Sequence, residues 1–334
     1  MRRRAFLAMA ALVPALAWFQ PGPARAETQQ LRIAQQFGIA YLPLIVAKER
    51  KLIEKHAAAS GLPDLKVEWL RLSGAAAMND SLISGGLDFA TAGIAPAILT
   101  WDKTRGKVDI SLIASLGSMP NILTTNNPDV KTIKDFTEKD RIALPSVKVG
   151  FQPIVLQMAA EKTFGQYDKL DNLTVSLPHP DATAAILSGT GGITAHFTSP
   201  PFMEQQLESG KAHAVLNSYD VLGGPHTFNV VYATRKFATD NPKTVNAFVA
   251  ALDEANAWIK ANPKDAAQLY IAEEKSKLDP AFVERIIRDP QIDFTTTPQQ
   301  VEAFVDFEYR VGLIKQKPTW KELFQPGLHS KSGS

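Results

Sequence analysis

The sequence predicts an α/β protein of two lobes, in which each lobe is a mostly parallel sheet flanked by helices and a ligand cleft lies between them. Two observations predict this class. Between residues 31 and 218, short β-branched or alternating runs alternate with helix-length segments, which is the βαβ pattern of parallel sheets. The chain has 334 residues, whereas a single hydrophobic core stops growing at roughly 250 to 300 residues. Two lobes are therefore expected.

The composition is that of an ordinary globular protein, with 45% hydrophobic and 21% charged residues. No cysteine occurs, which excludes Cys-ligated metals, Cys nucleophiles, disulfides and the acylated cysteine of lipoproteins. Residues 27–334 contain 32 basic and 34 acidic residues and are nearly neutral. Because nucleic-acid binding needs a basic face, no nucleic-acid partner is expected.

The N-terminus has the pattern of an export signal. Arginines occupy positions 2–4, residues 5–19 are apolar, and Ala24-Arg25-Ala26 is a small-x-small cleavage pattern. The apolar run is shorter than the roughly 20 residues that span a bilayer, so cleavage after Ala26 is favoured over an uncleaved anchor. Residues 3–7 resemble the twin-arginine motif, which leaves both the Sec and the twin-arginine routes open. Since no lipid anchor follows, the periplasm is the expected location.

The elements of the α/β region follow from hydrophobic periodicity and turn residues. Strands are expected at residues 31–37, 66–72, 89–92, 110–116, 141–144, 174–177, 193–198, 212–216 and 228–234. Helices are expected between them, at residues 42–59, 75–84, 96–105, 153–164, 182–187 and 202–209.

After residue 234 the pattern becomes purely helical. Four helix starts share a capping residue followed by proline: Asn241-Pro242, Asn262-Pro263, Asp279-Pro280 and Thr297-Pro298. The first of these helices carries an apolar stripe that includes Val245, Phe248 and Leu252, so it is expected to pack on another element. The polar residues 330–334 are predicted to form a disordered tail.

No sequence signature of catalysis is found. The six histidines include no pair spaced three to five residues apart, which argues against a helical zinc site. The chain also lacks a P-loop, a G-x-S-x-G elbow and a G-x-G-x-x-G fingerprint. The sequence therefore predicts no catalytic residue, no metal ligand and no cofactor, and the protein is expected not to be an enzyme.

Strand-to-helix turns are the candidate binding elements. The clearest turns are at residues 37–41, 72–75, 146–152 and 198–201. At such a turn the first helical N–H groups lack intrahelical partners and the helix dipole is positive, so an oxyanion can bind without a fixed charge. In open α/β sheets ligands lie outside the carboxyl ends of the strands, where these turns fall. Every α/β protein has such turns, so a structural role stays open for each one alone.

The side chains and backbone groups near these turns form the candidate site, for a ligand that is small and anionic. Amides, hydroxyls and a histidine can donate hydrogen bonds, aromatic rings can hold an apolar part of a ligand or belong to the core, and one lysine can supply a cation. The candidates are Gln36, Phe37, Gly38, Tyr41, Ser73, Gly74, Ala75, Lys148, Gly150, Phe151, Gln152, His179 and Ser199.

Several fragments carry a resemblance to a known family. They are residues 33–38 with 41–43, residues 85–90 with Gly93, residues 141–145, residues 178–182 and residues 199–202. In this order the fragments resemble the type II periplasmic solute-binding proteins of ABC importers, in the nitrate, sulfonate and taurine group. The resemblance extends from residue 31 to about residue 313.

The resemblance implies the two-lobed periplasmic-binding-protein fold of type II. One lobe comprises residues 30–117 plus 229–334 and the other comprises residues 118–228, with hinges near 116–120 and 227–231. Ligand binding in the cleft draws the lobes together. The closed form then docks on a membrane permease with ATPase subunits, and the binding protein itself is expected to be a monomer.

The resemblance does not fix the ligand, which can be a sulfonate, taurine, nitrate or another small organic or inorganic anion. An alternative is an enzyme on the same fold, related to the enzymes that form the thiamine pyrimidine. The absence of cysteine and the export signal both argue against it. A third reading, a ligand-sensing receptor domain, stays open.

Overall fold

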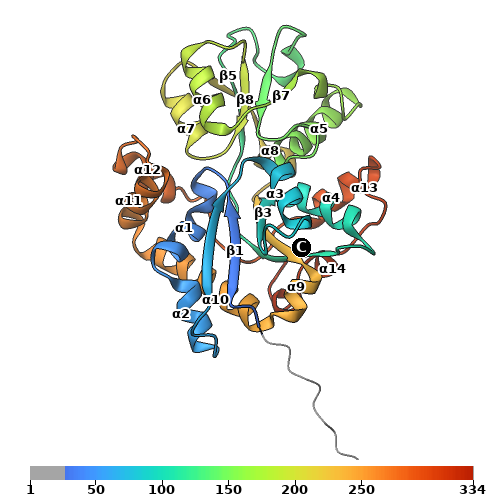
Figure 1. Cartoon of the computed structure of the whole chain (residues 1–334). Helices are drawn as coiled ribbons and strands as arrows, with labels where there is room; N and C mark the ends of the chain where they lie inside the picture. Colours follow the sequence, from blue (N-terminus) through green and yellow to red (C-terminus); the bar gives the residue numbers. More distant parts are fainter. Residues whose placement is uncertain (1–26, 334) are drawn as a thin grey trace, which may run out of the picture.

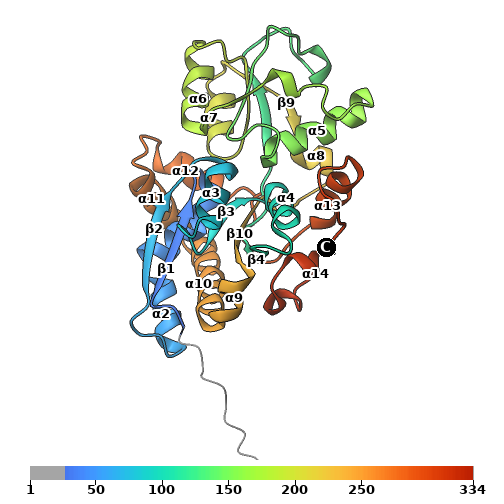
Figure 2. The ribbon, with the colours of Figure 1, turned by 45° about the vertical axis from the view of Figure 1, so that its right-hand side comes forward.

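The computed structural model describes residues 27–333 and has two lobes, one above the other in Figures 1 and 2. The expected signal peptide at residues 1–26, with its cleavage site and twin-arginine motif, lies outside the described residues, as does residue 334 of the tail. Within residues 27–333 the helices are too short or too polar to span a bilayer.

The first lobe, blue and orange in Figure 1, contains two sheets that meet edge to edge. Strand β1 (Gln30–Gln35) pairs in parallel with β2 (Lys66–Arg71). Strand β10 (Asn229–Thr234) pairs antiparallel with both β3 (Ala90–Gly93) and β4 (Ile110–Ser115). A parallel bridge between Ile33 and Phe89 joins β1 to the segment that leads into β3. The strands thus follow the order β2-β1-β3-β10-β4.

The second lobe, green and yellow in Figure 1, is built on one five-stranded sheet. Its order is β7 (Thr174–Ser176), β6 (Ile142–Leu144), β8 (Ala195–Thr198), β5 (Ile122–Thr125) and β9 (His213–Asn217). Strand β5 is antiparallel to its two neighbours, while β6 is parallel to β7 and β8. Strand β5 was not expected from the sequence, because its four residues form a short run next to the crossing between the lobes, although the turn residues Asn126-Asn127-Pro128-Asp129 follow it directly.

Each lobe therefore contains one reversed strand, and that strand is the first after the chain crosses from the other lobe. Strands β5 and β10 begin at the edge that faces the other lobe, where the remaining strands end, so they must run in the opposite direction. The two-lobed α/β class is confirmed. Leu116 N donates to Asn229 O (2.8 Å) and Phe228 N donates to Gly117 O (3.0 Å), so the two crossings lie side by side. The lobe boundaries and the hinge stay a prediction.

Helices cover both sheets. Those of the α/β region are α1 (Leu42–Glu49), α2 (Leu52–Ala59), α3 (Gly74–Ile83), α4 (Ile94–Thr104), α5 (Phe151–Phe164), α6 (His179–Ser188), α7 (Phe202–Glu208) and α8 (Ser218–Leu222), with short 3-10 turns η1 (Ile39–Tyr41), η2 (Ile133–Asp135) and η3 (Asp171–Leu173). The single helix expected at 42–59 is wrong. Lys51 has a left-handed backbone, with φ of 49°, and divides this segment into α1 and α2. Lys48 on α1 then pairs with Glu273, and Lys55 on α2 pairs with Glu254.

The helical region after β10 contains α9 (Arg235–Asp240), α10 (Pro242–Ala261), α11 (Pro263–Glu274), α12 (Pro280–Ile287), α13 (Val301–Arg310), α14 (Trp320–Leu323) and the turn η4 (Pro326–Leu328). Asp279 caps α12 as expected, since its side chain accepts a hydrogen bond from Ala281 N (2.8 Å). Asn241 and Asn262 do not cap the following helices. Their Nδ2 atoms donate instead to Phe237 O and Trp258 O, both at 2.9 Å, and so close the helices that precede them.

The helix expected to start at Thr297-Pro298 is also wrong, because α13 begins at Val301. The preceding segment is held to the crossing between the lobes. Gln299 N donates to Thr227 Oγ1 (2.8 Å) and Gln299 O accepts from Thr227 N (3.0 Å). This tertiary pairing keeps Gln299 out of a helix.

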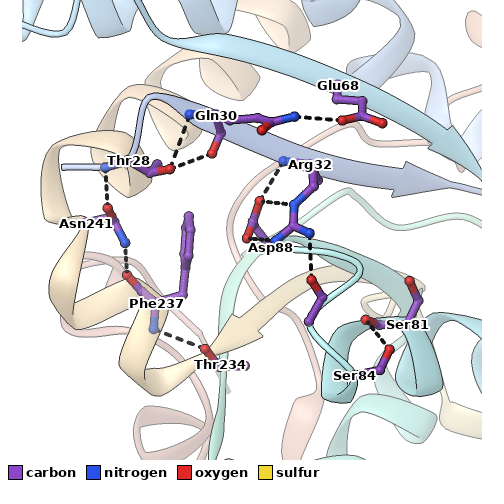
Figure 3. A network of polar contacts seen from close by, with 11 residues as sticks. Thr28, Gln30, Arg32, Glu68, Ser81, Ser84, Asp88, Thr234, Phe237 and Asn241 are labelled. Carbon is purple, nitrogen blue, oxygen red and sulfur yellow. Dashed lines mark hydrogen bonds and ion pairs between the residues drawn. The ribbon is translucent and has the colours of Figure 1, made fainter.

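The apolar stripe of α10 packs on the first lobe as expected: Val245, Phe248 and Leu252 are buried, and the Phe248 ring lies 4.7 Å from that of Phe89. Figure 3 shows the polar contacts beside this core. Arg32 binds both carboxylate oxygens of Asp88, with Nε–Oδ2 at 3.0 Å and Nη2–Oδ1 at 2.8 Å. The pair fixes β1 beside the start of β3, and β1 leads directly into the first candidate binding turn.

The described part of the expected disordered tail makes specific contacts. Lys331 Nζ lies 3.4 Å from Asp253 Oδ1 and also donates to Thr296 Oγ1. Residues 330–333 therefore pack on the end of the first lobe.

Candidate functional site

A cavity of about 30 Å³ lies between the two lobes, where the strands of both sheets end. Nearly all of its wall is buried. Its lining residues are Gln36, Phe37, Tyr41, Gly74, Ala75, Gly93, Pro96, Pro145, Ser146, Gly150, Phe151, Gln152, His179, Ser199, Phe228 and Asn229.

Four helices point their N-termini at this cavity. Helices α3, α4, α5 and α6 begin at Gly74, Ile94, Phe151 and His179, each just after a strand or strand-to-helix turn. The N-terminus of a helix presents unpaired N–H groups and the positive end of the dipole. The cavity is therefore electropositive without any charged side chain of its own.

Two glycines allow the lobes to approach closely at this point. A Cβ atom on Gly74 would lie 2.6 Å from Ser146 Oγ, and the φ of 81° at Gly74 is itself unfavourable for other residues. A Cβ atom on Gly93 would lie 2.4 Å from the Cβ of Phe151. A side chain at either position would push the two lobes apart.

The donors at the start of α3 are already used by the protein. Gly74 N donates to Gln36 Oε1 (2.9 Å), and Ala75 N donates across the cavity edge to Ser146 Oγ (3.1 Å). Gln36 Nε2 in turn donates to Thr91 O (3.2 Å). From the sequence, the N–H groups of Gly74 and Ala75 were expected to be free for a ligand. In this arrangement of the lobes they are not, because residues distant in the sequence supply acceptors.

Other donors at the cavity have no acceptor among residues 27–333. They are the backbone N–H groups of Phe151 and Gln152 at the start of α5, the Nδ2 of Asn229 and the Nε2 of His179. Asn229 is only 3% exposed and its Nδ2 is fully enclosed. A buried donor without a partner is costly, by about 1 to 3 kcal/mol, so these groups favour a ligand that supplies acceptor oxygens.

The cavity is lined without Asp, Glu, Lys or Arg. Burial lowers the pKa of His179 to about 3, so this ring is neutral at physiological pH. Burial also raises the pKa of Tyr41, which keeps its hydroxyl protonated. The wall is therefore uncharged and presents neutral hydrogen-bond donors.

Ten of the thirteen candidate residues line the cavity, and Gly38, Ser73 and Lys148 do not. Gly38 is buried under the carbonyl oxygen of Pro200, Ser73 is exposed at the start of α3, and the Lys148 side chain is exposed to solvent. The cation that Lys148 was expected to supply is therefore absent from the cavity wall. Whether the ten residues contact a ligand stays a prediction.

Six lining residues were not among the candidates: Gly93, Pro96, Pro145, Ser146, Phe228 and Asn229. Asn229 is the most informative of them, since it begins β10 directly after the crossing. A signal for it was present. It is a polar residue at the head of the apolar run 230–233, within the segment 227–231 predicted to cross between the lobes.

Solved structures share this fold. The alkanesulfonate-binding protein SsuA from Xanthomonas axonopodis pv. citri has a TM-score of 0.69 and 21% identity, over 90% of this chain and 99% of that chain. The nitrate-binding protein NrtA from Synechocystis PCC 6803 has a TM-score of 0.70 and 18% identity, over 89% and 84%. The periplasmic aliphatic sulphonate binding protein SsuA from Escherichia coli has a TM-score of 0.63 and 19% identity, over 90% and 92%.

At these identities the likeness shows the fold alone. Among curated proteins no sequence matches this chain. A family model, however, matches residues 24–273, which is most of the chain and includes every residue of the cavity wall. By this match the chain belongs to the NMT1-like family.

Proposed function

We propose that this protein is the extracytoplasmic solute-binding component of an ABC import system. It captures a small anion of the nitrate, sulfonate or taurine type and delivers it to a membrane permease with ATPase subunits. Its fold is that of SsuA and NrtA, whose names state that they bind alkanesulfonates and nitrate. Removal of the signal peptide after Ala26 and a monomeric protein in the periplasm belong to the same proposal.

One observation carries the choice of an anion. Four donors without acceptors among residues 27–333 belong to residues that line one cavity: Phe151 N–H, Gln152 N–H, Asn229 Nδ2 and His179 Nε2. An oxyanion offers several acceptor oxygens within a few ångströms and is complementary to helix N-termini. A cationic ligand would need carboxylates, and the wall has none.

The ligand is held by closure of the lobes. Contacts already join the two lobes: Ala75 N donates to Ser146 Oγ, Ile39 N donates to Pro200 O (3.0 Å), and Arg285 pairs with Glu208 (2.7 Å). In the proposed cycle these contacts break when the lobes part at the crossings, residues 116–120 and 227–231. A ligand that bridges α5 and Asn229 would then favour reclosure.

We also propose that the protein binds its ligand without converting it chemically. A panel of ligands tests this. A thermal-shift screen should use nitrate, alkane and aryl sulfonates, taurine, carboxylates and a pyrimidine. A ligand at 100 times its dissociation constant stabilises the fold by roughly 2.7 kcal/mol. We expect an oxyanion to raise the melting temperature and to be recovered unchanged. A chemically converted compound would favour the enzyme alternative, and stabilisation only by cationic or uncharged compounds would contradict an anion carrier.

A further inference from the structure

A buried hydrogen-bond network runs from the core of the second lobe to the cavity. We call Thr124, Gln206, His196 and His179 the histidine network. Thr124 Oγ1 donates to Gln206 Oε1, Gln206 Nε2 lies 2.7 Å from His196 Nδ1, and His196 Nε2 lies 2.8 Å from His179 Nδ1. Thr124, His196 and Gln206 have no exposed surface. Water therefore does not replace any of these contacts.

With the Gln206 amide oriented as in the structure, neutral rings leave one consistent assignment of donors and acceptors in this network. An amide nitrogen only donates, so His196 Nδ1 must accept from Gln206 Nε2 and carries no proton. Neutral His196 then carries its proton on Nε2 and donates it to His179 Nδ1. Thr198 Oγ1 lies 3.2 Å from the same His179 nitrogen, and Thr198 Oγ1 also donates to Ser199 O (3.4 Å). The proton of neutral His179 is thus confined to Nε2.

The Gln206 amide bonds to two further side chains in this orientation. Its Nε2 also donates to Thr183 Oγ1 (3.0 Å), while its Oε1 accepts from Thr124. Burial lowers the pKa of both His196 and His179, so each ring holds a single proton at neutral pH. His179 lines the cavity, and its ring stacks on Phe202 with centroids 5.4 Å apart. Its Nε2 has no partner among residues 27–333.

We infer that Gln206 and His196 are positioning residues that hold His179 as an Nε2–H donor toward the ligand. The inference rests on the proposed function and narrows it: at this wall the ligand must present an acceptor oxygen. An oxyanion head or a carbonyl meets that requirement. An ammonium group, such as the amine of taurine, does not, so taurine would place its sulfonate and not its amine against His179.

The first test is the tautomer of His179 in the ligand-free protein. Two-bond ¹H–¹⁵N correlation spectra at pH 7 distinguish the two neutral tautomers and the cation, and the His179→Phe variant assigns the signal. We expect the Nε2–H tautomer for both His179 and His196. An Nδ1–H tautomer or a cationic ring at His179 would overturn the inference, whatever the ligand.

The second test breaks the network at its buried end. Gln206→Met keeps the length of the side chain and removes the donor to His196. Gln205→Met is the matched control, because Gln205 is on the same helix and donates only to Pro201 O (3.2 Å). With nitrate and methanesulfonate as probes, we expect mixed His179 tautomers and about tenfold weaker binding in Gln206→Met, and less than a twofold change in Gln205→Met.

The outcomes separate the inference from the proposed function. An unchanged His179 tautomer in a folded Gln206→Met variant would overturn the positioning role of Gln206. Wild-type protein with the Nε2–H tautomer is also tested for binding of these probes and of other oxyanions. If it binds none of them, both the anion-carrier function and the role of His179 toward a ligand are contradicted. If Gln206→Met does not fold, the wild-type tautomer still decides whether His179 is a donor.

Discussion

Two buried histidines close to the cavity differ in how their ring nitrogens are bonded, and this difference separates a structural role from a binding role. His226 and His179 are 0% and 8% exposed, and burial lowers their pKa to about 4 and about 3. Both rings contact aromatic rings: His226 lies 5.4 Å from Phe151 and His179 lies 5.4 Å from Phe202. By burial and pKa alone the two residues would be assigned the same role.

The hydrogen bonds distinguish them. His226 Nδ1 lies 3.2 Å from Thr227 O and its Nε2 lies 2.9 Å from Ser218 Oγ, so both ring nitrogens are used by the protein. Among residues 27–333 His179 uses only Nδ1, and this residue lines the cavity. The comparison teaches that an unused nitrogen, and not a shifted pKa, marks the histidine available to a ligand.

The largest expected effect is on stability, from His226→Ala. The substitution removes a ring enclosed by Phe151, Phe304 and Tyr219 and leaves two hydrogen-bonding groups without their partner. We expect the free energy of unfolding to fall by about 3 kcal/mol, measured by urea denaturation. His213→Ala is the control, since His213 is only partly buried, and it should cost less than about 1 kcal/mol. An equally small effect of His226→Ala would contradict a structural role for His226.

The next largest effect is on the pH dependence of stability, which His179→Phe should reduce. The folded pKa of His179, about 3, lies below the unfolded value of 6.5. The unfolded chain therefore binds more protons between these values, so stability from this group is present above pH 6.5 and is lost as the pH falls. When the pH is lowered from 7.5 to 5, the free energy of unfolding of wild type should fall by roughly 2 kcal/mol more than that of the variant. Parallel stability curves for the two proteins would show that His179 is not held neutral by burial.

His179→Phe should also weaken ligand binding while keeping the stack on Phe202. Loss of one hydrogen bond to an anion costs about 1.5 to 3 kcal/mol, which corresponds to at least a tenfold rise in Kd. Isothermal titration with the anion found in the ligand screen measures this change. His213→Phe, outside the cavity wall, should bind as wild type does. Unchanged affinity in His179→Phe would assign both histidines to structure.

The smallest expected effect comes from Asn229→Leu, which replaces an unpartnered buried amide with a side chain of similar size. We expect about fivefold weaker anion binding and no loss of stability, because no protein hydrogen bond is broken. Asn126→Leu is the contrast, since Asn126 Nδ2 donates to Ile186 O (3.2 Å) and its loss should cost about 1 kcal/mol of stability. A comparable loss of stability in Asn229→Leu would indicate that Asn229 has a structural partner.

Local sequence determined the elements and the turns that face the cavity. Hydrophobic periodicity placed nine of the ten strands within residues 27–333, and the turns before Gly74 and Phe151 lie where the strand pattern put them. Helix α6 was expected only from residue 182, whereas it begins at His179. Such features depend on residues within a few positions of one another, so a single sequence contains them. The errors have the opposite origin. Thr297-Pro298 does not start a helix because Gln299 pairs with Thr227, which is 72 positions away.

Tertiary structure decided which donors remain available at the cavity. Ala75 N–H was predicted to be free, but Ser146, 71 positions later, accepts its hydrogen bond. His179 Nδ1 is bonded to His196, which in turn is bonded to Gln206, and Asn229 is a candidate because no acceptor among residues 27–333 lies against its Nδ2. A sequence specifies which groups can form hydrogen bonds. Which of them stay unpaired depends on the partners that folding brings within about 3 Å.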